Sequence, residues 1–163
     1  MRLGVEIRGE RCTLRSVAAE DIDTMLVWEN DPEVREFGDA EKIFTRSDMA
    51  EFVRNQRCGL AANGQQRLMI IAPDGRTVGA IDLFDFDGRQ AMVGILVYAH
   101  ADRRRGYGSD ALRTIGGYAR DAGVAMLYAD VAATNTASLR LFASCGFVRT
   151  EESGETVRFE KML

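Results

Sequence analysis

A glycine-rich basic segment in the second half of the chain carries residue types that bind phosphate. It consists of Arg103, Arg104, Arg105, Gly106, Tyr107, Gly108 and Ser109. Glycine lets the backbone adopt positive φ and lets its N–H groups approach a ligand closely. A helix that begins here adds unpaired N–H donors and the positive end of its dipole. The segment therefore predicts a strand-to-helix turn that binds a phosphate-bearing ligand. By itself it also fits a plain helix start with solvated arginines.

A second segment, 135–147, has the pattern of a polar residue that opens a helix ending in glycine. It begins with Asn135, continues through Ser138 and Phe142, and reaches Gly146. Together the two segments resemble, in the same order, the two cofactor motifs of the GNAT superfamily of N-acetyltransferases. The first motif is Gln/Arg-x-x-Gly-x-Gly/Ala in that family and reads Arg-x-x-Gly-x-Gly over 103–108 here. The resemblance implies that Asn135, Ser138 and Phe142 contact the cofactor with the arginine and glycine loop.

The family resemblance implies acetyl-CoA as the cosubstrate and no metal. It also implies that backbone groups at the end of an apolar strand bind the pantetheine arm, here Leu96, Val97 and Tyr98. Many members carry a tyrosine seven residues after the asparagine, where this chain has Phe142. A phenyl ring cannot donate a proton, so water or another side chain protonates the departing thiolate, or nothing does. This departure leaves open a module that binds acetyl-CoA without transferring its acetyl group.

Acetyl transfer to an amine requires a proton acceptor. A lysine-like amine, with a pKa of about 10.4, must lose a proton before it attacks the thioester. Asp130 lies five residues before Asn135 at the end of a predicted strand, where some family members carry a glutamate. We predict that Asp130 is the base and works through water, while a turn-capping aspartate is the alternative. No residue resembles an acyl-carrying nucleophile, so we expect direct attack in a ternary complex.

The predicted acceptor residues lie mostly in the first half of the chain. The segment 28–34, with Leu14, Arg15 and Asp21 before it, resembles the branch that contains spermidine and ribosomal-protein N-acetyltransferases. Between positions 29 and 41 there are six acidic residues and one arginine, which would attract a cationic amine; a solvated acidic loop is the alternative. We expect a small, polyamine-like amine, with the N-terminal amine of a protein as the alternative. The predicted acceptor-site residues are Trp28, Glu29, Glu33 and Asp82.

Composition excludes several other classes of function. The net charge of −4 argues against binding to nucleic acid, which needs a basic face. Cys12, Cys58 and Cys145 are far apart, and with a single histidine they suggest neither a metal cluster nor a disulfide framework. We expect reduced thiols in a cytoplasmic protein. The first residues lack a signal-peptide pattern, and the longest apolar run, 91–99, is too short to span a bilayer, so no membrane partner is expected.

Periodicity and turn signals predict the elements that position these residues. The resemblance implies one domain over 1–163 with the α/β (α+β mixed) GNAT fold. Its mixed, mostly antiparallel sheet would have six to seven strands flanked by about four helices. An edge strand at the C-terminus would allow a homodimer. We predict strands over 12–15, 68–72, 77–86, 91–98, 126–131, 147–150 and 156–161, and a loop over 59–64. We predict helices over 20–30 and over 47–56, the second with Ser47 as its N-cap. A third helix would run from the glycine loop to Gly123, and a fourth would begin after Asn135.

Overall fold

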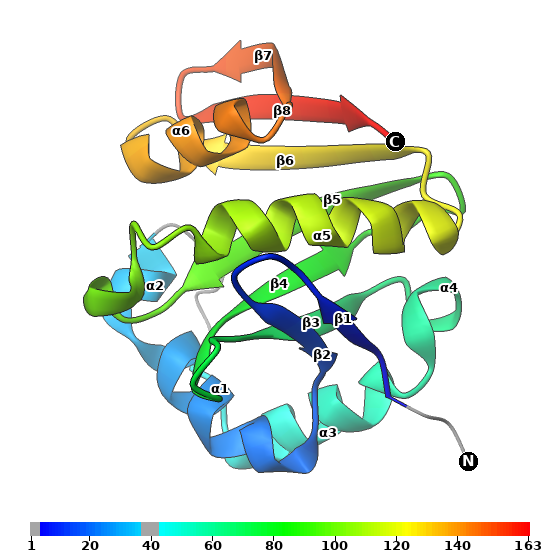
Figure 1. Cartoon of the computed structure of the whole chain (residues 1–163), viewed down its shortest axis with the longest axis vertical. Coiled ribbons are helices and arrows are strands. Elements are labelled where there is room, and N and C mark those ends of the chain that lie inside the picture. The colour runs from blue at the N-terminus through cyan, green and yellow to red at the C-terminus, as the bar shows by residue number, and fades with distance from the viewer. Residues whose placement is uncertain (1–3, 37–42) are drawn as a thin grey trace.

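The structure is a computed structural model that describes residues 4–36 and 43–163. Its centre is one eight-stranded sheet with the order β1-β2-β3-β4-β5-β6-β8-β7 (Figure 1). All neighbouring strands are antiparallel except β5 and β6, which are parallel. This confirms the predicted mixed sheet, with more strands than expected. The strands are β1 Glu6–Arg8, β2 Thr13–Ser16, β3 Gln66–Ile71, β4 Thr77–Phe84, β5 Gln90–Val97, β6 Met126–Ala132, β7 Val148–Ser153 and β8 Thr156–Met162.

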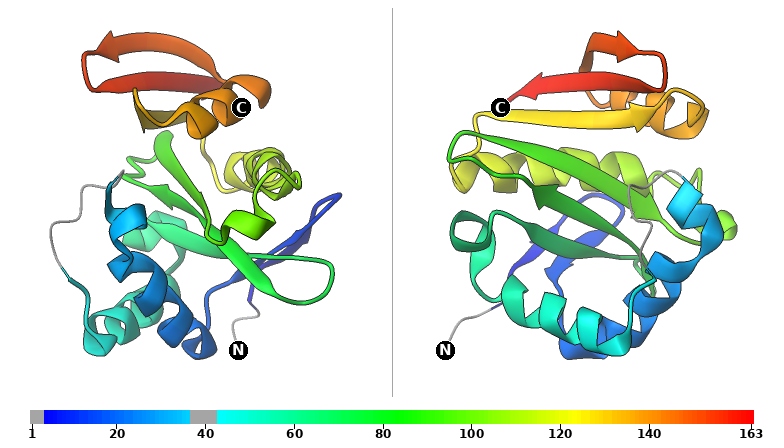
Figure 2. Two further views of the ribbon diagram at one scale, coloured as in Figure 1. Left: turned by 90° about the vertical axis from the view of Figure 1, so that its left-hand side faces the viewer. Right: turned by 180° about the vertical axis from the view of Figure 1, so that it is seen from behind.

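Helices cover both faces of the sheet (Figure 2). On one face, α1 and α3 pack Met25, Trp28 and Met49 against Met69 of β3. On the other, the larger core gathers side chains of α5 and α6 over Leu68. Side chains of successive strand residues point to opposite faces, so both layers bury residues of one strand. The helices are α1 Ile22–Asn30, α2 Pro32–Glu36, α3 Arg46–Gln56, α4 Gly59–Asn63, α5 Tyr107–Asp121 and α6 Thr136–Ser144, with short 3₁₀ helices η1 Ala19–Asp21 and η2 His100–Asp102.

Two local predictions were wrong. Helix α3 is capped by Thr45 rather than Ser47, because Thr45 and Asp48 exchange side-chain to backbone hydrogen bonds. The segment 59–64 is not a loop but contains α4, which ends at Gly64 with φ 71°. The predicted end of the first helix at position 30 is confirmed, and Pro32 opens α2, where the missing N–H costs nothing. Strand β1 carried too few apolar residues to be predicted.

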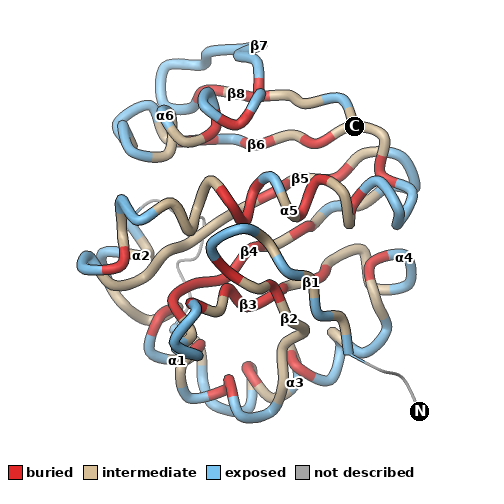
Figure 3. The backbone as a smooth tube through the Cα atoms, viewed as in Figure 1, coloured by how far each residue is buried: buried red, intermediate tan, exposed pale blue. Residues whose placement is uncertain are grey.

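The two halves of the sheet separate beyond a short contact between β5 and β6. These strands pair only over Gln90–Met92 and Met126–Tyr128, whereas β5 continues to Val97 and β6 pairs with β8 along its whole length. The backbone of β5 past Met92 therefore does not pair with β6. Buried residues concentrate in the central strands and the helix faces that cover them, and β7 is exposed (Figure 3). Among the described residues, no helix combines the length and apolar content of a membrane span.

Candidate active site

The C-terminal half of β5 presents backbone groups to the gap beside β6. The Tyr98 N–H donates to the Val78 carbonyl at 3.0 Å, and Leu96 lies opposite Ala80 of β4. Backbone groups of successive residues in an antiparallel strand point alternately to either side. The backbone groups of Tyr98 and Leu96 therefore face β4, and their contact with the cofactor stays a prediction. The backbone groups of Val97 and Ile95 face the gap. Sequence reasoning missed Ile95, because the β4–β5 pairing register decides which residues face the gap.

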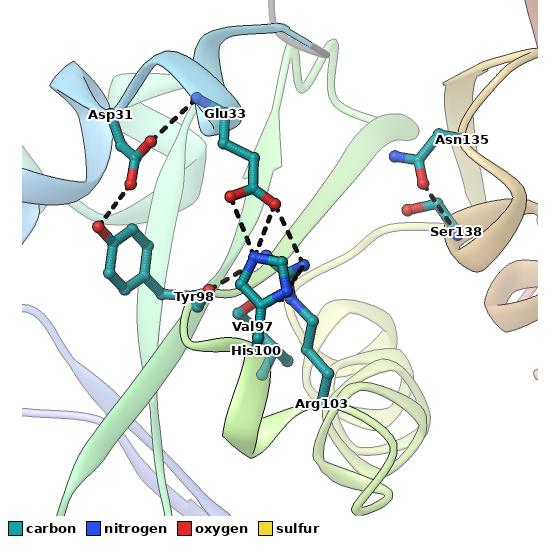
Figure 4. Close-up of polar contacts among 8 residues, drawn as sticks. All are labelled: Asp31, Glu33, Val97, Tyr98, His100, Arg103, Asn135 and Ser138. Atoms are coloured by element: carbon teal, nitrogen blue, oxygen red, sulfur yellow. Dashed lines mark hydrogen bonds and ion pairs between the residues drawn. The ribbon is translucent and has the colours of Figure 1, made fainter.

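Arg103, the first residue of the glycine-rich motif, fixes the end of β5. Its guanidinium donates to the carbonyls of Val97 and Tyr98, each at 3.1 Å, and lies 3.5 Å from a carboxylate oxygen of Glu33 on α2 (Figure 4). The prediction placed Arg103 on the cofactor phosphates. In the structure this side chain links the strand end, the following loop and α2, and its contact with the cofactor stays a prediction.

A network of polar side chains surrounds this strand end on the α1–α2 side (Figure 4). Glu33 pairs with His100 at 2.8 Å, and the hydrogen bond from the imidazole lowers the pKa of the Glu33 carboxyl. The Tyr98 hydroxyl donates to Asp31 at 2.6 Å, which lowers the pKa of Asp31 and raises that of Tyr98. The Tyr98 ring stacks on Trp28 with centroids 5.4 Å apart. Glu33, predicted as an acceptor residue, therefore lies in this network.

The glycine-rich loop forms a tight turn into α5. Gly106 is the N-cap with φ 85°, and a Cβ there would lie 2.7 Å from Cδ of Arg11. Gly108 allows α5 to pack closely against α6, because a Cβ there would lie 3.2 Å from the Leu141 side chain. Arg105 donates to the Ala101 carbonyl at 2.9 Å and so braces the turn. Arg104, Tyr107 and Ser109 complete the predicted loop, and Arg104 also has positive φ, 61°.

Asp110 in the first turn of α5 anchors this loop to the β1–β2 hairpin. Its carboxylate accepts the backbone N–H groups of Glu10, Arg11 and Cys12 at 2.9 to 3.0 Å. Desolvation would raise the pKa of Asp110, but these hydrogen bonds lower it overall. Burial and the same carboxylate raise the pKa of the Cys12 thiol to about 12. Sequence reasoning missed Asp110, because its partners lie about 100 residues away.

Asn135 opens α6 as predicted, and its side-chain oxygen accepts the Ser138 N–H at 3.3 Å (Figure 4). Phe142 was predicted to contact the cofactor. Its side chain is buried in the core, with 3% exposed, where it packs edge-on to Phe147 and stacks on Phe159. This environment explains why an apolar ring is suitable here, and the contact of Phe142 with the cofactor stays a prediction.

One pocket brings together three of the four predicted acceptor residues. Trp28, Glu29 and Asp82 line it, whereas Glu33 does not. The pocket has a volume of about 160 Å³, and β5 closes one side at Gly94 to Leu96. Arg67 lies within it and binds Asp82, the residue opposite it in the β3–β4 register. Sequence reasoning missed Arg67, because strand pairing decides which charges meet. The complete lining is Trp28, Glu29, Val34, Arg67, Ala80, Asp82, Gly94, Ile95 and Leu96.

Asp130 lies in a different, larger pocket on β6 and the β7–β8 hairpin. Arg158, its cross-strand neighbour, binds both carboxylate oxygens at 2.8 Å and holds the pKa of Asp130 below its usual value. The pocket also contains Glu151, Glu152, Ser153 and Thr156 and shares no lining residue with the pocket of Trp28. The structure therefore does not bring Asp130 together with the acceptor residues, and its catalytic role stays a prediction. Within 4–36 and 43–163, no group of three potential metal ligands occurs.

Comparison with known proteins agrees with this architecture. Residues 11–148 match the family described as "Acetyltransferase (GNAT) domain". A spermidine N-acetyltransferase from Vibrio cholerae, solved with CoA and spermine, has a TM-score of 0.81 at 17% identity over 93% of this chain and 95% of that one. The ribosomal L7/L12 α-N-protein acetyltransferase RimL with coenzyme A has a TM-score of 0.83 at 14% identity over 98% of both chains.

A structure solved with acetyl-CoA and a different second ligand shares the fold as well. AAC(6')-Ib, solved with paromomycin and acetyl-CoA, has a TM-score of 0.74 at 17% identity over 94% of each chain. A search of curated protein sequences finds no match. At these identities the structural likeness shows the fold, while the acceptor must be argued from the site.

Proposed function

This chain belongs to the GNAT family of acetyl-CoA-dependent acetyltransferases, and we propose that it acetylates the primary amine of a small, polyamine-like cationic acceptor. The observation that carries this proposal is the pocket of Trp28, Glu29 and Asp82. The pocket contains two carboxylates and one guanidinium. It lies against the part of β5 that does not pair with β6. A cationic amine held there would lie beside that strand.

The cofactor side of the site suits a long, phosphorylated thioester. Beyond Met92, backbone groups of Ile95 and Val97 face the gap between the strands, and an N–H in that position can polarise a thioester carbonyl. The turn at Gly106 and the first turn of α5 supply N–H donors for phosphate, with Arg104 beside them. Acetyl-CoA provides the thioester, and these residues bind and orient it.

Two proton transfers complete the proposed reaction. Asp130 is our proposed acceptor of the amine proton, through water; its carboxylate is ionised at neutral pH, and its ion pair with Arg158 lowers its pKa. Phe142 is buried and has no acidic proton, so we propose that water protonates the departing thiolate. Three free thiols support a reducing compartment, and we place the reaction in the cytoplasm.

The N-terminal amine of a protein is the second candidate acceptor. The observation in its favour is the open groove beside Asp130, about 450 Å³ in volume, where Glu151 and Glu152 could face a basic peptide. The likeness to RimL supports the same alternative. A peptide would lie along the β7–β8 hairpin rather than only in the small pocket.

The experiment that tests the proposal is thiol release from acetyl-CoA with spermidine, an aminoglycoside and a short peptide. Turnover with spermidine would support the polyamine acceptor, and turnover with the peptide alone would overturn it. Binding of acetyl-CoA without turnover on any amine would instead identify a non-catalytic binding module.

A further inference from the structure

A partly buried group of three charges forms the polar wall of the proposed acceptor pocket. The Arg67 guanidinium binds Asp82 in a bidentate fork, Nε to Oδ1 at 2.6 Å and Nη2 to Oδ2 at 2.7 Å. The same Nη2 lies 3.0 Å from Oε1 of Glu29. Their side chains are 13%, 24% and 23% exposed, respectively. Phe52 stacks under the guanidinium at 4.9 Å, so Arg67 is held from several sides.

These three residues carry a net charge of −1. Both carboxylate oxygens of Asp82 accept hydrogen bonds from Arg67. Glu29 contacts Arg67 through Oε1, so its other oxygen can accept a hydrogen bond from a ligand. The remaining lining is apolar or backbone: Trp28, Val34, Ala80, Gly94, Ile95 and Leu96. In a partly buried pocket each uncompensated charge is costly, so the charge count decides which ligands enter.

We propose that this pocket accepts one isolated ammonium group, and that Arg67 sets this specificity by neutralising Asp82 and leaving Glu29 for the acceptor. The inference rests on the proposed function and narrows its substrate class. The acceptor is an amine whose reacting end carries a single positive charge, such as an aminobutyl group. A short diamine would bring a second ammonium into the pocket without a partner, while further charges on a longer acceptor would lie outside it.

Charge variants of the full chain test the inference with butylamine and 1,3-diaminopropane as probes. Wild type has a pocket charge of −1, Arg67→Gln has −2, Asp82→Asn has 0, and the double variant R67Q/D82N returns to −1. Arg67→Lys keeps the charge but loses the fork. For each protein, KM and kcat for both amines are measured with the Kd of acetyl-CoA and the thermal midpoint.

We expect the KM of wild type for the diamine to exceed that for butylamine by at least about tenfold. Arg67→Gln should lower this ratio by about tenfold or more, and R67Q/D82N and Arg67→Lys should restore it. Asp82→Asn should raise the KM for both amines. The acetyl-CoA Kd should stay unchanged, because neither Arg67 nor Asp82 is among the proposed cofactor-binding residues. If Arg67→Gln does not fold, the double and lysine variants still give the comparison with Asp82→Asn.

Two failures can be distinguished. The inference is overturned, and the proposed function stands, if wild type acetylates amines but the double variant does not restore the preference for butylamine over 1,3-diaminopropane. The same conclusion follows if this preference does not change with the net charge of the pocket. If wild type binds acetyl-CoA and acetylates neither amine nor spermidine, the proposed function is overturned and the inference with it.

Discussion

Asp130 shows how a neighbouring residue defines what a carboxylate can do. Because Arg158 binds both of its oxygens and lowers its pKa, Asp130 is ionised at neutral pH but weakly basic. If it accepts the amine proton, Asp130→Asn should reduce kcat by about 10²-fold and leave the Kd of acetyl-CoA unchanged. Steady-state kinetics and calorimetry measure the two quantities, and an unchanged kcat would remove Asp130 from the mechanism.

Arg158 offers the matched test, through the pH dependence of the rate. Activity that needs ionised Asp130 is present above the pKa of this carboxyl and is lost as pH falls through it. Arg158 lowers this pKa, so Arg158→Met should raise it and move the acidic limb of the kcat profile to higher pH. An acidic limb that does not move would show that another group controls it.

Phe142 allows a test of the absent proton donor. Its ring is enclosed by Phe147 and Phe159, so Phe142→Tyr would bury a hydroxyl in the core. We expect a loss of about 1–3 kcal/mol in the free energy of unfolding and no increase in kcat. Denaturant unfolding and kinetics check this. A rise in kcat would mean that the new hydroxyl reaches the thiolate after all.

At the scale of elements, Asp110 joins helix α5 to the β1–β2 hairpin. In Asp110→Asn an amide group faces backbone donors, so we expect a loss of about 1–3 kcal/mol in stability at pH 7. The pKa of Asp110 is lowered in the folded state. Its stabilisation is therefore present above the unfolded pKa of about 3.9 and is lost as pH falls below it. Urea unfolding should show wild type and variant converging in acid, and a constant difference would contradict this.

Two glycines of the same region should respond oppositely to alanine. Gly106 has φ 85° and lies against Arg11, so Gly106→Ala should cost roughly 1–2 kcal/mol and weaken acetyl-CoA binding. Gly117, inside α5, has open space where a Cβ would be. Gly117→Ala is the control and should stabilise the protein by up to about 1 kcal/mol. Thermal unfolding and calorimetry compare them, and equal effects would rule out a special role for the turn.

Sequence patterns predicted the longer elements well and the short ones poorly. Helix α5 and strands β4 and β6 have apolar periods long enough to identify, and the helix start at Asn135 has a polar cap. Helices α2 and α4, each five residues long, and three-residue β1 depend on tertiary packing. The position of the loop after β5 was predicted correctly. The hydrogen bonds from Arg103 to carbonyls at the end of β5 could not be predicted from the motif.

The site was partly predictable for the same reason. Trp28, Glu29 and Asp82 meet in one pocket, as an acidic acceptor site requires. The neutralisation of Asp82 by Arg67, and that of Asp130 by Arg158, depends on which residues pair across strands. A one-residue change of register would place these side chains on opposite faces. The predicted acidic positions Asp39 and Glu41 lie outside the described residues.

For the whole molecule, the cofactor should bind the gap between two parts of one sheet and stabilise them together. Acetyl-CoA at 100 times its Kd should add about 2.7 kcal/mol to the free energy of unfolding, or roughly 5–10 °C in Tm for a chain of 163 residues. Differential scanning fluorimetry measures the shift. Desulfo-CoA should produce a similar shift if the phosphate turn dominates binding, and no shift with either compound would contradict the assigned cofactor site.

Strand β7 forms the C-terminal edge of the sheet, and the predicted homodimer through this edge stays a prediction. Its exposed side chains include Arg149, Glu151 and Glu152, and charges on an edge oppose pairing with another sheet. A dimer formed here would therefore depend on ionic strength, which sedimentation at two salt concentrations would reveal.

The division of the sheet at β5 also bears on how such a protein can change over generations. The proposed acceptor pocket is built from α1, α2, β3 and β4, while the predicted cofactor contacts come from the loop before α5 and from α6, and β5 contributes to both. Substitutions in the first half of the chain can change the amine specificity without changing how the thioester of acetyl-CoA is bound. Laboratory evolution aimed at a new acceptor should therefore diversify positions 28–34 and 67–82 and hold β5 fixed.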